Sequence, residues 1–206
     1  MLQDKIIYWI GGSACAGKST LAEMYCRKYN LPLYSCDEHF NRHLQQISEE
    51  HQPAMSKISR MDANEAFYSR SRAARLRVYI QSFIEDFSFV AADLAKGEEK
   101  AIVVEGNQLL PSLVKPLLEK HHMAVWIVPQ EEFQRKQYRK REWVPAVLAA
   151  SADPEAAYEN WMVRDAAFAS MVYKEAAGEK LNVMLVDGSR DLAETFLELE
   201  RLFQPG

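Results

Sequence analysis

The residues best suited to do chemistry lie in one short segment near the start of the chain. Gly12, four variable residues and then Gly17-Lys18-Ser19 match the phosphate-binding pattern G-x-x-x-x-G-K-[ST]. Glycines let the main chain wrap closely around phosphate oxygens, and the dipole of a following helix adds positive potential. We expect Lys18 to bind the outer phosphates of a nucleotide and the Ser19 hydroxyl to ligate Mg²⁺. The predicted nucleotide-binding run is Gly12, Ser13, Ala14, Cys15, Ala16, Gly17, Lys18, Ser19 and Thr20.

Apolar runs place this motif directly after a strand. Residues 5–10 form a short continuous apolar stretch that ends at Gly11-Gly12, as expected of a strand buried on both faces. Further apolar runs predict strands at residues 31–36, 101–104, 124–128 and 181–186.

Helical segments separate these strands. They are residues 17–29, residues 76–96 with a stop at Gly97, residues 154–178 after an Asp153 cap, and a last helix after a Ser189 cap. Residues 41–60 are polar and give no clear prediction. Strands that alternate with helices indicate an α/β fold, in which helices cover both faces of a mostly parallel sheet.

Length, charge and cysteine content exclude several classes of protein. At 206 residues the chain is most economically one domain, 1–206. Its net charge of −4 provides no positive field to attract nucleic acid or a membrane, and no apolar stretch reaches the ~18 residues of a membrane span. Three cysteines without metal-ligand spacing suit a reducing compartment. We therefore expect a cytoplasmic protein, monomeric or homodimeric, whose partner is a small molecule.

Four other short motifs follow the later strands in order. They are Ser35-Cys36-Asp37-Glu38-His39-Phe40, Glu105-Gly106-Asn107, the basic run from Arg135 to Arg141, and Asp187-Gly188-Ser189. With the phosphate loop, this series resembles P-loop small-molecule kinases, most closely the uridine kinase and phosphoribulokinase-like group and the nucleoside monophosphate kinase-like group. The resemblance implies a three-layer P-loop NTP hydrolase-type fold with a parallel five-stranded sheet in the order 2-3-1-4-5. It also implies ATP and Mg²⁺ as cofactors, an acceptor-binding helical insertion at 41–97 and a lid region at 130–160.

Two of these motifs place a carboxylate at the end of an apolar strand. Asp37 lies at the edge where open α/β sheets bind ligands, and the resemblance implies that it accepts the proton of the acceptor hydroxyl. Glu38 is the alternative base, and capping the next helix is the alternative role of Asp37. A carboxylate at Glu105 is costly without a cation, so we expect it to contact the metal ion or the acceptor, with a structural hydrogen bond as the alternative.

Basic residues of the lid are predicted to neutralise the transferred phosphoryl group. Arg139 is the first choice and Arg135 the second, because phosphoryl transfer depends on stabilising charge. Glu131 lies four residues before Arg135, so an ordinary ion pair on a solvated helix is the alternative. Arg164 is a further candidate for the same phosphates, and a pair with a neighbouring acid is its alternative.

Two binding sites complete the prediction. Asp187 and Gly188 are expected to shape the pocket for the nucleotide base, with an ordinary turn between strand and helix as the alternative. Phe40 and Arg75 are expected to bind the acceptor together with Asp37 and Glu105, with core packing as the alternative for Phe40. The insertion carries five arginines, at positions 60, 70, 72, 75 and 77. If several of them converge, the acceptor is anionic. Helical spacing favours their dispersion instead, because positions 70, 72, 75 and 77 cannot share one face.

The favoured function is an ATP-dependent kinase that phosphorylates a hydroxyl of a small molecule, such as a nucleoside, a sugar or a cofactor precursor. The alternatives are a nucleoside monophosphate kinase and a non-catalytic nucleotide-binding switch protein. The chain contains no N-K-x-D segment of a GTPase and no L-S-G-G-Q segment of an ABC ATPase, which favours the kinase.

Overall fold

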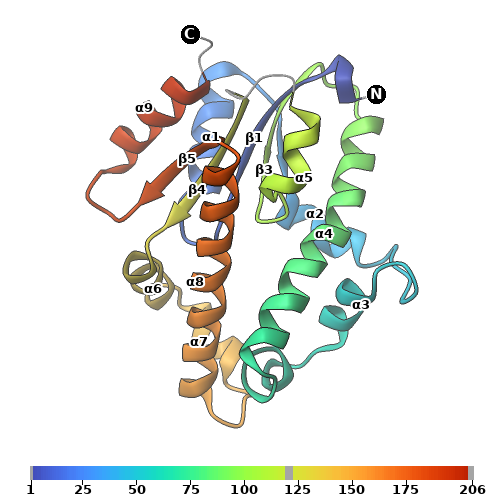
Figure 1. Ribbon diagram of the computed structural model, residues 1–206, viewed down its shortest axis with the longest axis vertical. Helices are drawn as coiled ribbons and strands as arrows, with labels where there is room; N and C mark the ends of the chain where they lie inside the picture. The colour runs from blue at the N-terminus through green and yellow to red at the C-terminus, as the bar shows by residue number, and fades with distance from the viewer. Residues whose placement is uncertain (1, 119–122, 204–206) are drawn as a thin grey trace.

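Five parallel strands form the central sheet of the structure, a computed structural model that describes residues 2–118 and 123–203 (Figure 1). They are β1 (Ile6–Gly12), β2 (Leu33–Ser35), β3 (Ala101–Glu105), β4 (Ala124–Pro129) and β5 (Asn182–Val186). The strands stand in the order β2-β3-β1-β4-β5, and every neighbouring pair is parallel. The predicted strand order is confirmed.

The register of the strands brings their carboxyl ends to one edge of the sheet. Ile10 of β1 pairs with Glu105 of β3, which also pairs with Ser35 of β2. On the other side of β1, Gly12 pairs with Ile127 of β4. The segments that leave these strands therefore begin next to one another, as the ligand-binding edge of an open α/β sheet requires.

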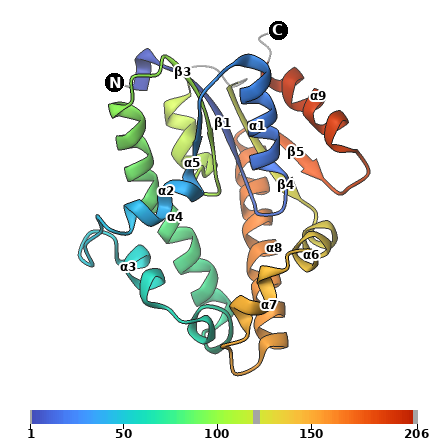
Figure 2. The same ribbon diagram turned by 180° about the vertical axis from the view of Figure 1, so that it is seen from behind.

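One face of the sheet is covered by α1 (Lys18–Tyr29) and α9 (Leu192–Phe203), which lie on the near side in Figure 2. Its core consists of strand residues and helix residues that are completely buried, among them Ile10, Val103, Val125, Leu21 and Leu199. Burial of one such side chain stabilises the fold by roughly 1.5–3 kcal/mol.

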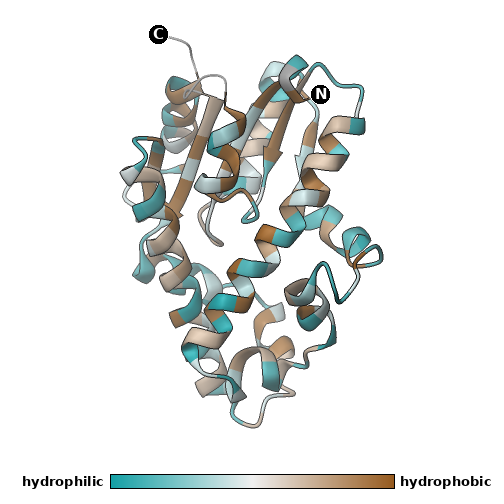
Figure 3. Ribbon diagram, turned by 45° about the vertical axis from the view of Figure 1, so that its right-hand side comes forward, coloured by the Kyte–Doolittle hydropathy of each residue, from teal (hydrophilic) through white to brown (hydrophobic). Residues whose placement is uncertain are grey.

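The opposite face is covered by α4 (Arg72–Lys96), α5 (Pro111–Val114) and α8 (Pro154–Gly178). Trp126 of β4 is completely buried there, and its indole Nε1 donates a hydrogen bond to the Leu109 carbonyl at 2.7 Å. Phe87 of α4 and Phe168 of α8 belong to the same core. Two helical layers thus enclose the sheet, and the hydrophobic colour is concentrated in the strands between them (Figure 3). The predicted three-layer α/β fold is confirmed.

The two long helices, α4 and α8, extend past the carboxyl edge of the sheet (Figure 1). Beyond that edge lie α3 (Pro53–Arg60), α6 (Glu131–Arg139) and α7 (Trp143–Leu148). The remaining short elements are η1 (Leu2–Asp4), α2 (Cys36–His43), the π-helical turn η2 (Glu65–Ser69) and η3 (Lys115–Leu117). Residues 41–60, which the sequence left without a prediction, contain the end of α2 and all of α3.

Local hydrogen bonds explain where the predicted helix starts were right and where they were wrong. Asp153 caps α8 as predicted, because its carboxylate accepts a hydrogen bond from the Ala156 amide. Ser189 does not cap the last helix. The helix begins at Leu192, and Asp191 and Glu194 each accept a hydrogen bond from the other's amide, which forms a capping box.

None of the helices in residues 2–118 and 123–203 combines the length and the hydropathy that crossing a membrane requires.

Candidate active site

The phosphate-binding segment connects β1 to α1 through a loop that requires glycine at two positions. Gly12 has φ +131°, and a Cβ atom there would lie 1.9 Å from the Ile127 carbonyl oxygen of the neighbouring strand. Gly17 has φ +81° directly before the first residue of α1. Gly12 thus leaves no room for a side chain, and the positive φ of Gly17 disfavours one. The loop therefore lies between a buried strand and a helix N-terminus, where anions bind.

Lys18 is held inside this loop. Its side chain is 8% exposed, and Nζ donates hydrogen bonds of 2.8 Å to the Ser13 carbonyl and to Asn107 Oδ1. Burial lowers the pKa of Lys18, and the negative charges of Glu105 and Asp37 partly oppose this shift. A buried ammonium with only neutral acceptors in direct contact is suited to bind phosphate oxygens.

Glu105 lies beside the loop as a buried carboxylate. It is 2% exposed and accepts hydrogen bonds from Ser35 Oγ at 2.7 Å and from Ser19 Oγ at 3.3 Å. Burial raises the pKa of Glu105, against the opposing charge of Lys18. A hydroxyl and a carboxylate in contact are hard oxygen donors, which fit a Mg²⁺ ion that keeps waters and phosphate oxygens as its other ligands. Ser19 and Glu105 are the residues that would hold it.

A cavity of about 450 Å³ opens next to the loop, and we call it the central cavity. Its lining includes five residues singled out from the sequence, namely Ala14, Asp37, Phe40, Arg75 and Arg164. Glu105 and Glu38 are not among its lining residues. Asp37 and Glu38 are both exposed, but only Asp37 lines the cavity. Asp37 lies in the first turn of α2, after Ser35 as the N-cap residue, so it does not occupy the capping position.

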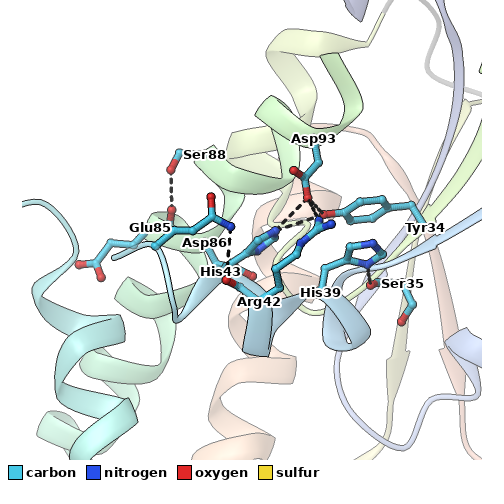
Figure 4. A network of polar contacts seen from close by, with 10 residues as sticks. Tyr34, Ser35, His39, Arg42, His43, Glu85, Asp86, Ser88 and Asp93 are labelled. Atoms are coloured by element: carbon cyan, nitrogen blue, oxygen red, sulfur yellow. Dashed lines mark hydrogen bonds and ion pairs between the residues drawn. The ribbon is translucent and has the colours of Figure 1, made fainter. Parts of the chain in front are cut away.

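A network of polar contacts fixes α2 against α4 (Figure 4). His43, completely buried, contacts Asp86 Oδ1 through Nδ1 at 2.6 Å and Asp93 Oδ2 through Nε2 at 3.0 Å. Asp93 also accepts hydrogen bonds from Arg42 and from the Tyr34 hydroxyl. Because α2 also carries Asp37, this network helps to position the Asp37 carboxylate at the cavity.

The lid arginines lie in different surroundings. Arg135 Nε donates to Glu131 Oε1 at 3.0 Å and Arg135 Nη1 to Glu159 Oε2 at 2.8 Å, which corresponds to the ion-pair alternative. Arg139 is exposed and does not line the central cavity. Arg141, which was not among the predicted site residues, lines the central cavity. Its positive charge lowers the pKa of both Lys18 and Cys15.

Arg164 forms the acid pair that was the alternative prediction, and its role toward phosphate stays a prediction. Its Nη2 atom lies 2.7 Å from Asp165 Oδ1, which corresponds to the acid-pair alternative, and its guanidinium lies 4.0 Å from the centre of the Tyr79 ring. Burial lowers the pKa of Arg164, but the charge of Asp165 outweighs this effect, so the pKa is raised. Arg164 is thus charged and fixed in place at the cavity wall.

A second cavity of about 420 Å³ lies on the other side of the loop, between α1, α6 and α9. Phe133, Val186, Arg190 and Leu192 are among its lining residues, together with Cys15 to Gly17 of the loop. The predicted base-pocket residues Asp187 and Gly188 form the turn next to it rather than its lining. Asp187 Oδ1 accepts hydrogen bonds from the amide and the hydroxyl of Ser189, which fixes that turn.

Asn107, Arg70 and Arg141 line the central cavity but were not selected from the sequence. Asn107 belongs to the Glu105-Gly106-Asn107 motif, and Arg141 is the last residue of the basic run from Arg135. Their motifs could therefore have identified both as candidate site residues. Arg70 was named only as one of a group of arginines. The contact that distinguishes Asn107, its hydrogen bond with Lys18, joins segments far apart in the sequence. Arg70 and Arg141 instead make local contacts, with the Glu65 carbonyl and with the Tyr138 ring.

Comparisons with known proteins identify the fold. Neither a protein-family model nor a curated protein sequence matches the chain. A shikimate kinase from Bacteroides thetaiotaomicron superposes with a TM-score of 0.53 at 13% identity, over 96% of each chain. A Thermus thermophilus protein reaches 0.51 at 17% identity, over 98% of this chain and 99% of its own. An uncharacterized protein from Eubacterium ventriosum reaches 0.50 at 15% identity, over 97% and 98%.

At these identities the comparisons establish the fold alone. The strand order, the helices on both faces and the matched structures define it as the fold of the P-loop kinases. The closer likeness to the uridine kinase and phosphoribulokinase-like group stays a prediction from sequence motifs.

Proposed function

We propose that this chain is an ATP- and Mg²⁺-dependent kinase that transfers the γ-phosphoryl group to a hydroxyl of a small molecule. The observation that carries the proposal is the position of Asp37. Its carboxylate lines a cavity that also contains Ala14 of the phosphate loop and Asn107, the partner of Lys18. A candidate base, a residue of the phosphate loop and the amide that holds Lys18 thus share one space that can hold an acceptor.

The chemistry assigned to each residue is limited to binding and to moving one proton. The acceptor oxygen attacks the γ-phosphorus, the bond to the β-bridging oxygen breaks, and ADP leaves. Asp37 takes the proton of the acceptor hydroxyl, while Lys18 and the loop amides hold the phosphates. Bound Mg²⁺, held by Ser19 and Glu105, would neutralise charge on the β- and γ-oxygens.

Several features support a small-molecule acceptor over a macromolecule. The central cavity, of about 450 Å³, has the size of a small-ligand pocket. The net charge of −4 gives no general attraction for nucleic acid. One protein with the same fold is named a shikimate kinase, and transfer to a small molecule is in keeping with that name.

Calorimetry and a phosphorylation screen test the proposal. We expect ATP with Mg²⁺ to bind the purified chain, and a panel of hydroxylated metabolites to yield a phosphorylated product by mass spectrometry. Lys18→Ala serves as the blank, because it removes the phosphate-loop ammonium. A chain that binds neither ATP nor GTP in the presence of Mg²⁺ would contradict the proposal. Product formed from a nucleoside monophosphate and not from any hydroxyl acceptor would favour the monophosphate kinase instead.

A further inference from the structure

Three arginines from two separate parts of the chain meet at the wall of the central cavity. Arg70 precedes α4, Arg75 lies in the first turns of α4, and Arg164 lies in the middle of α8. The other two arginines of this helical region, Arg72 and Arg77, are exposed and do not line the cavity.

Arg70 and Arg75 are fixed by main-chain carbonyls and keep unused donors. Arg75 is 4% exposed, and its Nη1 donates to the carbonyls of Arg70 at 2.5 Å and Tyr68 at 3.2 Å. Arg70 Nε donates to the Glu65 carbonyl at 2.8 Å. Arg75 Nε and Arg70 Nη1 are buried and find no hydrogen-bond acceptor among the described residues. A buried guanidinium donor without an acceptor costs free energy, which a ligand oxygen would recover.

The charges around this cluster are not balanced. Asp165 forms an ion pair with Arg164. The charge of Glu65 raises the pKa of Arg70, but Glu65 Oε1 also lies 3.9 Å from Lys57 Nζ. Burial lowers the pKa of Arg75, and the neighbouring charges of Arg70 and Arg164 lower it further. The cluster thus carries more positive charge than the acids beside it neutralise.

We propose that Arg70, Arg75 and Arg164 bind an oxyanion of the acceptor, a carboxylate or a phosphate monoester. The inference rests on the proposed function, because it names the class of acceptor. Main-chain carbonyls and Asp165 already hold these guanidinium groups, so they lose little further conformational entropy when a ligand binds. Each guanidinium can donate two parallel hydrogen bonds to a carboxylate or a phosphate.

The position of Asp37 determines how the acceptor is oriented in the central cavity. Asp37 follows Ser35 by two residues, and Ser35 and the phosphate-loop residue Ser19 both donate hydrogen bonds to Glu105. Asp37 therefore belongs to the phosphate-loop end of the cavity, where a second anion would be repelled. The oxyanion therefore lies at the arginine cluster and the reacting hydroxyl at Asp37. The cavity is also lined by the apolar rings of Phe40, Phe67 and Phe83. The acceptor class is a small hydroxylated compound with one anionic group and an apolar face.

Thermal unfolding of the full chain without nucleotide tests the oxyanion site. The probes are lactate for the carboxylate and methyl phosphate for the phosphate ester, each compared with chloride at equal ionic strength. We expect at least one probe to raise the Tm of the wild-type chain and of Lys18→Ala, which lacks the phosphate-loop ammonium. Arg70→Gln removes this rise, Arg70→Lys reduces it, and the matched surface variant Arg77→Gln retains it. A rise that Arg70→Gln and Arg70→Lys both retain in full would overturn the inference.

Matched acceptors test the same site during turnover. In pairs such as a hydroxy acid and its amide, or a sugar phosphate and its free sugar, we expect a lower KM for the anionic member. Arg70→Gln raises that KM about tenfold to hundredfold, the effect of losing a charge-assisted hydrogen bond, and leaves kcat within a few fold. Equal KM values within a pair would overturn the inference even if the kinase is active. An arginine-dependent rise in Tm without any phosphorylated product would support the oxyanion site and count against the kinase.

Discussion

The Lys18 ammonium donates a 2.8 Å hydrogen bond to the Asn107 amide oxygen, and this contact joins the phosphate loop to the wall of the central cavity. The same amide donates from Nδ2 to the Tyr79 hydroxyl at 3.4 Å. Asn107 thus lies between the nucleotide side and the acceptor side of the proposed site. In the proposed function Lys18 turns to the triphosphate when a nucleotide binds, and we therefore expect Asn107 to compete with the nucleotide for this lysine.

Substitution of Asn107 should therefore change ATP affinity in a direction that depends on the new side chain. Asn107→Ala removes the competing acceptor, and we expect ATP to bind about threefold to tenfold more tightly. Asn107→Asp replaces the amide by a carboxylate that holds Lys18 and repels phosphate, so ATP should bind about tenfold or more weakly. Isothermal titration calorimetry with ATP and Mg²⁺ measures both changes.

Asn41→Ala is the control for this pair of variants, because Asn41 is an exposed residue of α2 outside both cavities. It should bind ATP as the wild-type chain does. If both Asn107 variants weaken ATP binding to the same extent, Asn107 has a structural role only.

The Asp37→Asn variant distinguishes a kinase whose acceptor is a hydroxyl from one whose acceptor is a phosphate. An ionised phosphate needs no base, whereas transfer to a hydroxyl loses about 10²–10⁴-fold in kcat without one. We expect a loss of this size for Asp37→Asn with ATP affinity little changed, measured as initial rates with the acceptor from the screen. Glu38→Gln is the matched control, because Glu38 is exposed and does not line the cavity, and its kcat should stay within about twofold of the wild-type value. An unchanged kcat for Asp37→Asn would argue against Asp37 as the base.

The parts of this site that depend on local chain geometry could be predicted from the sequence. The glycines, Lys18 and Ser19 follow one another between a buried strand and a helix, so their spacing alone fixes their arrangement. Asp37 could be placed because the carboxyl ends of parallel strands meet at one edge.

The convergence of the arginines could not be predicted, since it depends on where a helix begins. If positions 70 to 77 formed one helix, their arginine side chains would point to different faces. In the structure α4 starts at Arg72, and Arg70 lies before the Ser71 cap in an extended conformation. That cap, through Ser71 Oγ and the Ala74 amide, also starts α4 one turn before the predicted Leu76. Arg70 thereby leaves the helical pattern and reaches the same cavity as Arg75.

Arg141 is the lid arginine that we expect to act on the transferred phosphoryl group. It lines both cavities beside the phosphate loop, and its guanidinium lies 5.1 Å from the centre of the Tyr138 ring, which positions it. Arg135 is already paired with two glutamates. We expect Arg141→Gln to lower kcat by about 10²-fold or more, by analogy with other arginines that stabilise transferred phosphate, and Arg135→Gln to change it by less than about threefold. The reverse order of effects in steady-state kinetics would assign the role to Arg135, the second choice from the sequence, rather than to Arg141.

The network around His43 predicts how stability depends on pH. Burial raises the pKa of Asp93, but hydrogen bonds from His43 and Tyr34 outweigh burial, so the pKa lies below its usual value. A lowered carboxyl pKa stabilises the fold above the unfolded value of about 3.9, and this contribution is lost as the pH falls through the folded pKa. Burial raises the pKa of Asp86, so its contribution has the opposite sign and is lost as the pH rises.

Asp93→Asn should accordingly destabilise the chain more at pH 7 than near pH 3. Loss of charge-assisted hydrogen bonds from Tyr34 and His43 costs about 1–3 kcal/mol, which lowers the Tm of a domain of this size by roughly 3–10 °C. Thermal unfolding at both pH values measures this difference, and Glu98→Gln, at an exposed position, is the carboxylate-to-amide control. An equal loss of Tm at pH 7 and pH 3 would show that the charge of Asp93 does not contribute, and that packing alone holds α2 against α4.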